Sequence, residues 1–202
     1  MGKPNVVRDD IIREEEMIQT LKNTNKLDVQ ALLSILWLTG ARISEALNVK
    51  GKDIEDCGEY LSISFITLKQ RVKEGQLMPR RTLKILKGTI YYNIIKEYIN
   101  KSRIYPELKL FNKTAKYYWK YMKKANPNIY FHLFRHSLAT LASDKVDVFD
   151  MKEWFGWKKM DMAVNYVHPK KAIDNFYEAM KKDTIKKEAE KIGSGLKEPI
   201  NK

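Results

Sequence analysis

HLFRHSLATLA, residues 132–142, combines an apolar helical face with polar side chains at its start. His132 and Arg135 are three residues apart, so a helix places them on the same face. An apolar side that suits burial is formed by Leu133, Phe134, Leu138 and Leu141. An arginine on a mostly apolar helix is costly unless suitable partners meet its charge. We therefore expect a partly buried helix whose arginine meets a carboxylate, a helix end, or a phosphate that the chain does not contain.

The sequence on both sides of this segment is also mostly helical in pattern. Apolar residues recur at helical spacing, and Gly40 follows the most apolar segment where a C-cap is expected. The helices that we expect cover residues 9–24, 26–40, 41–50, 89–103, 117–125, 147–157, 160–169 and 170–191.

Residues 59–68 instead alternate Leu61, Ile63 and Phe65 with serines, which is typical of a strand. Residues 76–86 resemble its antiparallel partner, and the short VKEG region between the two segments suits a turn. The fold class we predict is therefore mainly α with one small antiparallel β-sheet (α+β). A chain of 202 residues fits one domain with short appendages. We expect a helical extension over 1–26, the domain over 27–192, and a flexible tail over 193–202.

The charge favours a nucleic-acid partner. Lysine and arginine number 38 against 25 aspartate and glutamate, which leaves a formal net charge of +13. Such an excess is typical of proteins that contact phosphates. A proteome that is simply rich in lysine explains the composition equally well, so the motifs must decide.

Several classes are excluded or disfavoured. The chain has no run of 18 apolar residues, and its start, MGKPNVVRDD, lacks the apolar stretch of a signal peptide. One cysteine, Cys57, excludes an internal disulfide, and with three histidines it disfavours a structural zinc site. The acidic cluster at residues 53–56 suggests magnesium, but acids after a helix end are usually turn residues. We expect an intracellular, cytoplasmic protein that binds no metal or other cofactor.

Three segments together resemble one family, the tyrosine recombinases or phage-type integrases. TGARISEALNVKGKDI, residues 39–54, resembles the region of the first arginine, here Arg42, with Glu45 three residues later. His132 and Arg135 match the His-x-x-Arg box. WFGWKKMDMAVNYVHP, residues 154–169, resembles the nucleophile segment, with Trp157 at its His-or-Trp position and Tyr166 nine residues further on. Each box alone is weak evidence, but three in order over about 125 residues are specific.

The resemblance implies a catalytic domain and a role for each residue. Tyr166 would attack a DNA phosphate and form a 3′-phosphotyrosine link, which needs neither metal nor ATP. Arg42 and Arg135 would bind the non-bridging oxygens, and Glu45 would orient nearby side chains. His132 would assist proton transfer, and Trp157 would donate its indole N–H to the phosphate.

The resemblance also implies a lysine on the hairpin that protonates the leaving 5′-oxygen. Lys69 lies 27 residues after Arg42 and suits the family spacing best, with Lys73 second and Lys84 further along. Lys73 and Arg71 are otherwise expected to contact DNA.

Simpler interpretations exist for each residue taken alone. Arg42 and Glu45 are a plausible surface ion pair, and Trp157 a plausible core residue beside Trp154 and Phe155. Tyr166 is one of 11 tyrosines, so only its spacing to the other boxes singles it out. We assign His136 and His168 to structure or interfaces, and Tyr117, Tyr118 and Trp119 to the core.

The resemblance implies double-stranded DNA as a partner, and a homo-oligomer, a tetramer on DNA. The apolar stripe of residues 170–191 would dock into a neighbouring subunit. Most relatives also carry a separate amino-terminal DNA-binding domain, and only about 26 residues precede the core helix here. Either the sequence covers the catalytic domain of a longer protein, or the protein acts without such a domain. Two alternatives remain open, a type IB topoisomerase that relaxes supercoils and a DNA-binding protein without catalysis.

Overall fold

The computed structural model describes residues 10–67, 75–102 and 104–166. The chain divides into two compact units, residues 1–165 and 166–202, and Tyr166 is the described residue of the second. The expected helix over residues 170–191, His168, and the candidate residues Lys69, Arg71 and Lys73 lie outside the described residues.

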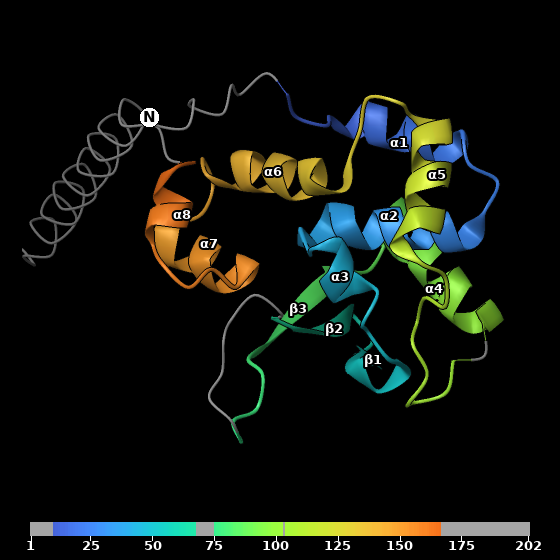
Figure 1. The fold of residues 1–202 in the computed structure, drawn as a ribbon, viewed down its shortest axis with the longest axis horizontal. Coiled ribbons are helices and arrows are strands. Elements are labelled where there is room, and N and C mark those ends of the chain that lie inside the picture. Colours follow the sequence, from blue (N-terminus) through green and yellow to red (C-terminus); the bar gives the residue numbers. More distant parts are fainter. Residues whose placement is uncertain (1–9, 68–74, 103, 167–202) are drawn as a thin grey trace, which may run out of the picture. The chain divides into compact units, whose positions relative to one another are not determined.

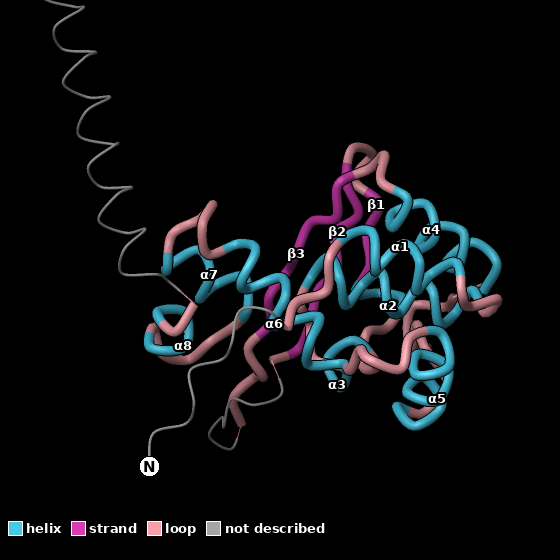
Figure 2. Tube along the Cα trace, turned by 90° about the horizontal axis from the view of Figure 1, so that it is seen from above, coloured by secondary structure: helices cyan, strands magenta, loops and turns pink. Residues whose placement is uncertain are grey.

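Helix α2 (Leu27–Thr39) forms the centre of the first unit. It packs against α4 (Ile90–Ser102), α5 (Ala115–Ala125) and α6 (Phe131–Ala142), which surround it in Figures 1 and 2. Its buried residues are Val29, Ala31, Leu32, Leu33, Ser34, Ile35, Leu36 and Thr39. A helix that is apolar on all sides needs cover on all sides, which explains its central place. Gly40 ends it in the left-handed conformation, as predicted.

The amino-terminal segment is fastened to α5 and α6. Helix α1 (Glu14–Lys22) packs against α5, and Glu16 accepts a hydrogen bond of 2.9 Å from the side chain of Asn126. The backbone N–H of Ile12 donates to the Ser137 hydroxyl on α6 at 2.8 Å. Helix α5 begins at a cap in which Thr114 accepts from the backbone of Tyr117.

The sheet is antiparallel and has three strands in the order β1–β2–β3 (Figure 2). Strands β2 (Tyr60–Ile66) and β3 (Arg80–Leu86) form the predicted hairpin, with Ser62 opposite Lys84. Alternate residues of both strands are buried, which for β2 confirms the alternation seen in residues 59–68. The buried face contacts α2 and α3, and β3 also contacts α7.

The third strand, β1 (Ile54–Asp56), was not predicted. We expected the acidic cluster over residues 53–56 to be a turn, but it pairs with β2 in an edge strand. Its acids bind basic partners from other elements: Asp53 pairs with Arg80, and Asp56 with Lys96. Among the described residues no group of three or more His, Cys, Asp or Glu side chains is arranged to hold a metal ion.

The helix expected over residues 41–50 is much shorter in the structure. Helix α3 covers Ile43–Ala46, and a 3₁₀ turn, η1 (Gly51–Asp53), follows. The intervening backbone turns away because Val49 and Gly51 hydrogen-bond to the segment around Leu108 and Leu110. Tertiary pairing therefore wins over helical propensity in this short segment.

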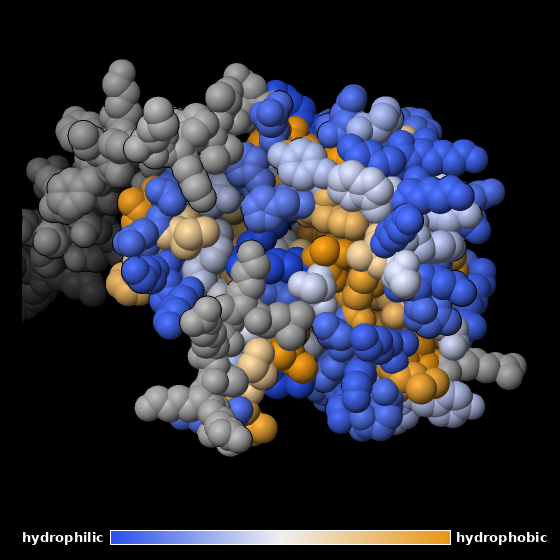
Figure 3. Space-filling model, viewed as in Figure 1, coloured by the Kyte–Doolittle hydropathy of each residue, from blue (hydrophilic) through white to orange (hydrophobic). Residues whose placement is uncertain are grey.

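Two short helices complete the described unit, α7 (Val148–Phe155) and α8 (Asp161–Val164), which pack together. The fold class, helix-rich with one small antiparallel sheet, is confirmed. In the face shown in Figure 3, hydrophilic side chains occupy most of the outline and hydrophobic ones show towards the centre. The described helices include none that is both long and apolar enough to cross a membrane.

Candidate active site

Arg135 on α6 is buried, with an exposed fraction of 2%. Its Nη1 donates to the carbonyl of Gly40 at 2.8 Å, and its Nη2 to the carbonyl of Phe155 at 2.6 Å. Gly40 is the C-cap of α2 and Phe155 is the last residue of α7, so both acceptors lie at the negative ends of helix dipoles. Of the three kinds of partner expected for this arginine, the structure supplies helix ends.

Arg42 lies two residues after Gly40, at the N-cap of α3. Its Nη1 contacts Oε1 of Glu45 at 2.7 Å, and its backbone N–H donates to Oε2 at 3.0 Å. The side chain remains 18% exposed, whereas that of Glu45 is fully buried. The turn between α2 and α3 therefore places one arginine at the surface beside the carbonyl that the other arginine holds.

Glu45 has a second cationic partner that the sequence analysis missed. Nη2 of Arg81, on β3, lies 2.8 Å from Oε2 of Glu45, and its Nη1 donates to the carbonyl of Trp154. Burial by itself raises the pKa of the Glu45 carboxyl. The Arg42 amide, the charge of Arg81 and the Arg42 side chain outweigh burial and hold that pKa below its ordinary value. Glu45 is therefore a carboxylate shared by two arginines.

A signal for Arg81 lay in the sequence but was not used. Residues 81, 83 and 85 share the buried face of β3, and the two-residue period of a strand puts Arg81 on the same side as Leu83 and Ile85. Burial lowers the pKa of its guanidinium, and the Glu45 carboxylate opposes that effect. A charged residue on the buried face of a predicted strand indicates a buried ion pair or a functional residue, but a comparison of motifs does not detect it.

Trp157 is buried and packs beside Arg135. Its ring stacks on Phe155 with centroids 4.6 Å apart, and the Arg135 guanidinium lies 5.4 Å from the Trp157 ring and 4.9 Å from the Phe155 ring. Gly156, between the two aromatics, ends α7 in the left-handed conformation. The glycine turn thus folds both rings onto the arginine.

The histidines of α6 lie in different surroundings. His132 is exposed in the first turn of α6, one turn before Arg135. His136 is buried, and burial lowers its pKa against an opposing effect of Asp10. The buried position of His136 is consistent with the structural assignment made for it.

Tyr166 follows α8 after one turn residue, Asn165, and is half-buried. Tyr166 is also the first residue of the second compact unit. The structure therefore assembles Arg42, Glu45, Arg135 and Trp157, with His132 on the same helix as Arg135.

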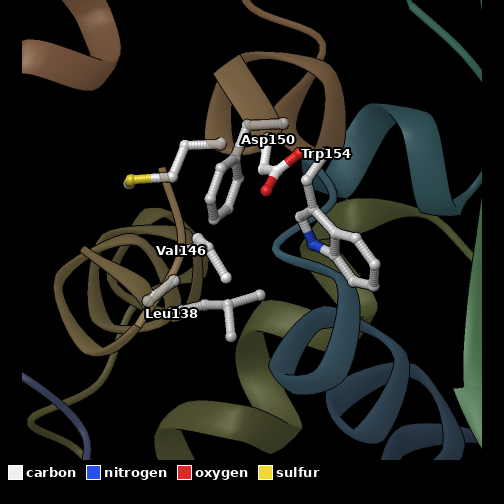
Figure 4. Close-up of a pocket in the computed structure, with 7 residues that line it drawn as sticks. Leu138, Val146, Asp150 and Trp154 are labelled. Atoms are coloured by element: carbon white, nitrogen blue, oxygen red, sulfur yellow. The ribbon is translucent and has the colours of Figure 1, made fainter. Parts of the chain in front are cut away.

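A cavity of about 240 Å³ lies between α6 and α7 (Figure 4). Leu138, Val146, Asp150 and Trp154 point towards its interior from the two helices and the segment that joins them. Its lining is apolar apart from Asp150, which carries negative charge. This cavity does not suit a phosphate, unlike the surface at Arg42.

The fold and the site define a class: a helical domain with a small antiparallel sheet, in which two arginines from separate segments meet at one helix end. Residues 11–172 match the model of the phage integrase family. The chain belongs to this family, that of the tyrosine recombinases, and its fold is that of their catalytic domain.

A probable integrase/recombinase of Acholeplasma phage L2 is 26% identical over 164 residues, which cover 75% of this chain and 53% of the relative. The XerH site-specific recombinase, solved bound to its difH substrate, superposes with a TM-score of 0.59 at 22% identity, over 79% of this chain and 50% of XerH. The catalytic domain of bacteriophage HP1 integrase has a TM-score of 0.56 at 19% identity, over 77% of this chain and 85% of that domain. The chain therefore spans about half the length of the curated relative and of XerH.

Proposed function

We propose that this chain is the catalytic part of a site-specific DNA recombinase that cuts and rejoins DNA strands through Tyr166. The tyrosine oxygen attacks the scissile phosphorus, the bond to the 5′-oxygen breaks, and a 3′-phosphotyrosine link and a 5′-hydroxyl result. Attack of a 5′-hydroxyl on that link reverses the step and rejoins the strand. The phosphoester bond is conserved throughout, so the cycle requires no ATP and no metal.

The observation that carries the proposal is the meeting of Arg42 and Arg135 at the end of α2. Arg135 holds the Gly40 carbonyl at 2.8 Å, and Arg42 follows two residues later with its side chain partly exposed. Phosphoryl transfer needs positive charge at the non-bridging oxygens, and a positioned arginine contributes about 10³-fold or more. Two segments 93 residues apart in sequence (135 − 42) thus supply the charge that the reaction requires.

The remaining groups divide the proton transfers and the orientation. His132, exposed on the first turn of α6, assists deprotonation of Tyr166, whose ordinary pKa near 10 makes it a weak nucleophile. Trp157 orients the site by its contact with Arg135, and its indole N–H is the donor we assign to the phosphate. Lys69 is the proposed general acid, with Lys73 the alternative, and Lys73 and Arg71 otherwise contact DNA.

The proposed partners are double-stranded DNA and further copies of this chain. The net charge of +13 supports binding to phosphates. We propose that four copies assemble on DNA through residues 170–191, and that the domain extends over residues 27–192.

Covalent trapping from a random pool of DNA tests the proposal whatever the target sequence is. The protein is incubated with short duplexes of random sequence, each nicked so that the cut fragment diffuses away and the adduct persists. Adducts that survive phenol extraction are isolated, and their DNA is sequenced. Wild-type protein should form them in excess EDTA, and Tyr166→Phe should form none while binding DNA normally.

Each other outcome has a distinct meaning. Binding without any adduct supports a non-catalytic DNA-binding protein, and an adduct that persists in Tyr166→Phe moves the nucleophile elsewhere. Loss of cleavage on chelation indicates a metal-dependent nuclease. Once a duplex has been selected, relaxation of supercoiled DNA without strand exchange between two duplexes would favour the topoisomerase alternative.

A further inference from the structure

Glu45 accepts from three donors that come from two elements. Oε1 lies 2.7 Å from Nη1 of Arg42, while Oε2 lies 3.0 Å from the Arg42 backbone nitrogen and 2.8 Å from Nη2 of Arg81. The Arg42 side chain is 18% exposed and that of Arg81 is 6% exposed. One buried carboxylate therefore joins a surface arginine of the proposed site to a buried arginine of the sheet.

The charges of this trio do not cancel. Arg42 and Arg81 contribute two positive charges and Glu45 one negative charge, so the group keeps one positive charge. Arg81 is buried, and its ion-pair partner is Glu45, which balances it. The remaining charge therefore lies on Arg42, the exposed member. Without Arg81, Arg42 and Glu45 would form a neutral pair where a phosphate needs a cation.

Arg81 also fixes the end of α7. Its Nη1 donates to the carbonyl of Trp154, and Arg135 donates to that of the next residue, Phe155. Two arginines from different elements thus hold consecutive carbonyls of the last turn of α7. A side chain at Gly156 would come within 3.1 Å of Cδ of Arg81, so the α7 end is packed directly onto this arginine.

Burial of Arg81 is not explained by stability alone. Its Nε is buried with no hydrogen-bond partner among the described residues, which costs about 1–3 kcal/mol for a polar group. Its neighbours on the same strand face are Leu83 and Ile85, and a buried ion pair is commonly no more stable than apolar residues of similar size. Position 81 therefore holds an arginine that costs stability, and this arginine is connected to Arg42 through Glu45.

We infer that Arg81 is a positioning residue for strand cleavage: by neutralising Glu45 it leaves the charge of Arg42 available to the scissile phosphate. This inference rests on the proposed function. The bond-making steps are unchanged, because Arg81 acts through Glu45 and Arg42 and does not touch the DNA.

The test compares two substrates built on the duplex selected by covalent trapping. One carries the ordinary phosphodiester, and the other a methylphosphonate, in which a methyl group replaces a charged non-bridging oxygen at the scissile position. The neutral substrate develops less negative charge and needs less from Arg42. A defect in charge supply is therefore relieved on the methylphosphonate, whereas a defect in folding or binding is not.

At saturating DNA, Arg81→Met should cleave the phosphodiester about 100-fold more slowly than wild type, the cost of losing one preorganised electrostatic contact. On the methylphosphonate its rate should fall within about threefold of wild type, and Arg42→Ala should show the same pattern. Arg80→Met is the matched control, because Arg80 is the adjacent arginine and pairs with Asp53 instead. It should resemble wild type on both substrates.

Two further variants guard against loss of folding. Arg81→Lys keeps the charge but cannot reach both acceptors, so it should be about tenfold slower on the diester and melt near the wild-type temperature. Adding Glu45→Gln to Arg81→Met removes the negative charge that pairs with Arg42. The double variant should therefore recover part of the rate of phosphodiester cleavage.

The outcomes separate this inference from the proposed function. If wild-type protein forms no adduct, the proposed function fails. If wild type forms adducts and Arg81→Met is wild-type on both substrates, or equally slow on both, the inference fails and the proposed function stands. No recovery in the double variant would also overturn it.

Discussion

Arg42 and Arg135 are held in different ways, and their loss should have different consequences. Arg135 is buried and satisfies the carbonyls that end α2 and α7, at 2.8 and 2.6 Å. Arg42 is partly exposed, and its partner Glu45 keeps a second cation in Arg81 when Arg42 is removed. Arg135 therefore contributes to the stability of the fold, whereas Arg42 contributes little to it.

We predict that Arg42→Ala and Arg135→Ala both lower cleavage by several orders of magnitude, since each leaves transition-state charge uncompensated. Only Arg135→Ala should also lower stability, by about 2–4 kcal/mol, because two buried carbonyls lose a charged donor. Urea unfolding and the adduct assay measure the two effects separately. A large loss of stability in Arg42→Ala would contradict the assignment of Glu45 to Arg81.

The general acid is best tested through its leaving group. If Lys69 is the general acid, its proton matters only when the 5′-oxygen leaves poorly, and general-acid catalysis then contributes about 10²–10⁴-fold. A 5′-bridging phosphorothiolate leaves as a thiolate and needs little protonation. Lys69→Ala should be impaired on ordinary DNA and nearly normal on the phosphorothiolate, whereas Arg42→Ala should be impaired on both.

Lys73→Ala is the matched control for Lys69→Ala and should cleave both substrates like wild type, with slightly weaker binding. Rescue by sulfur in Lys73→Ala would instead move the acid four residues along the hairpin.

At the level of secondary structure, the sequence pattern was sufficient to predict an element where the same period of apolar residues continues along the whole element. The apolar run that forms α2 and the alternation of β2 and β3 were predicted because their residues repeat at one period over many positions. Strand β1 was missed because its three residues carry two acids and pair only at a sheet edge. Its stability comes from partners remote in sequence, such as Lys96, which no local pattern reveals.

The same contrast holds for the candidate site. Motif resemblance selected Arg42, Glu45 and Arg135, since these stand at family spacings. Arg81 belongs to none of the motifs that we used, and its role depends on the distance between β3 and α3. Contacts between elements could therefore be found only in the structure.

The turn between α2 and α3 depends on Gly40. Its φ is +58°, and a Cβ there would lie 2.5 Å from Cε1 of the buried Phe155 ring. Gly88 has φ +92° with open space around it, so it is a matched control that shares the backbone strain alone. Gly40→Ala should be less stable than Gly88→Ala by about 1–3 kcal/mol, the cost of overpacking.

Cleavage should also fall in Gly40→Ala and not in Gly88→Ala, because the Gly40 carbonyl is the anchor of Arg135. The measurement is the adduct rate at a temperature where both variants are folded. An equal loss of adduct rate in the two variants would show that backbone strain alone, and not the contact with Phe155, causes the loss.

At the scale of the whole molecule, the chain is strongly basic and spans about half of XerH and of the curated relative. Binding of basic side chains to DNA phosphates depends steeply on salt, because counterions are released. When several copies assemble, the number of contacts to DNA rises although each copy makes no additional contact. The proposed assembly of several copies would therefore strengthen binding to DNA.

If residues 170–191 form the expected helix, their spacing puts Ile173, Phe176, Tyr177 and Met180 on one apolar stripe, which we assign to assembly. If this stripe docks into another copy, Phe176→Asp combined with Met180→Asp should prevent tetramers on DNA and leave the unfolding temperature of the free protein unchanged. Asn175→Asp combined with Ala179→Asp adds the same charge on the opposite helical face and should assemble normally. Sedimentation of protein–DNA complexes and thermal unfolding measure the two effects. A stripe variant that lowers the unfolding temperature of the free protein would show that the stripe packs within its own chain, and the basis of assembly would then lie elsewhere.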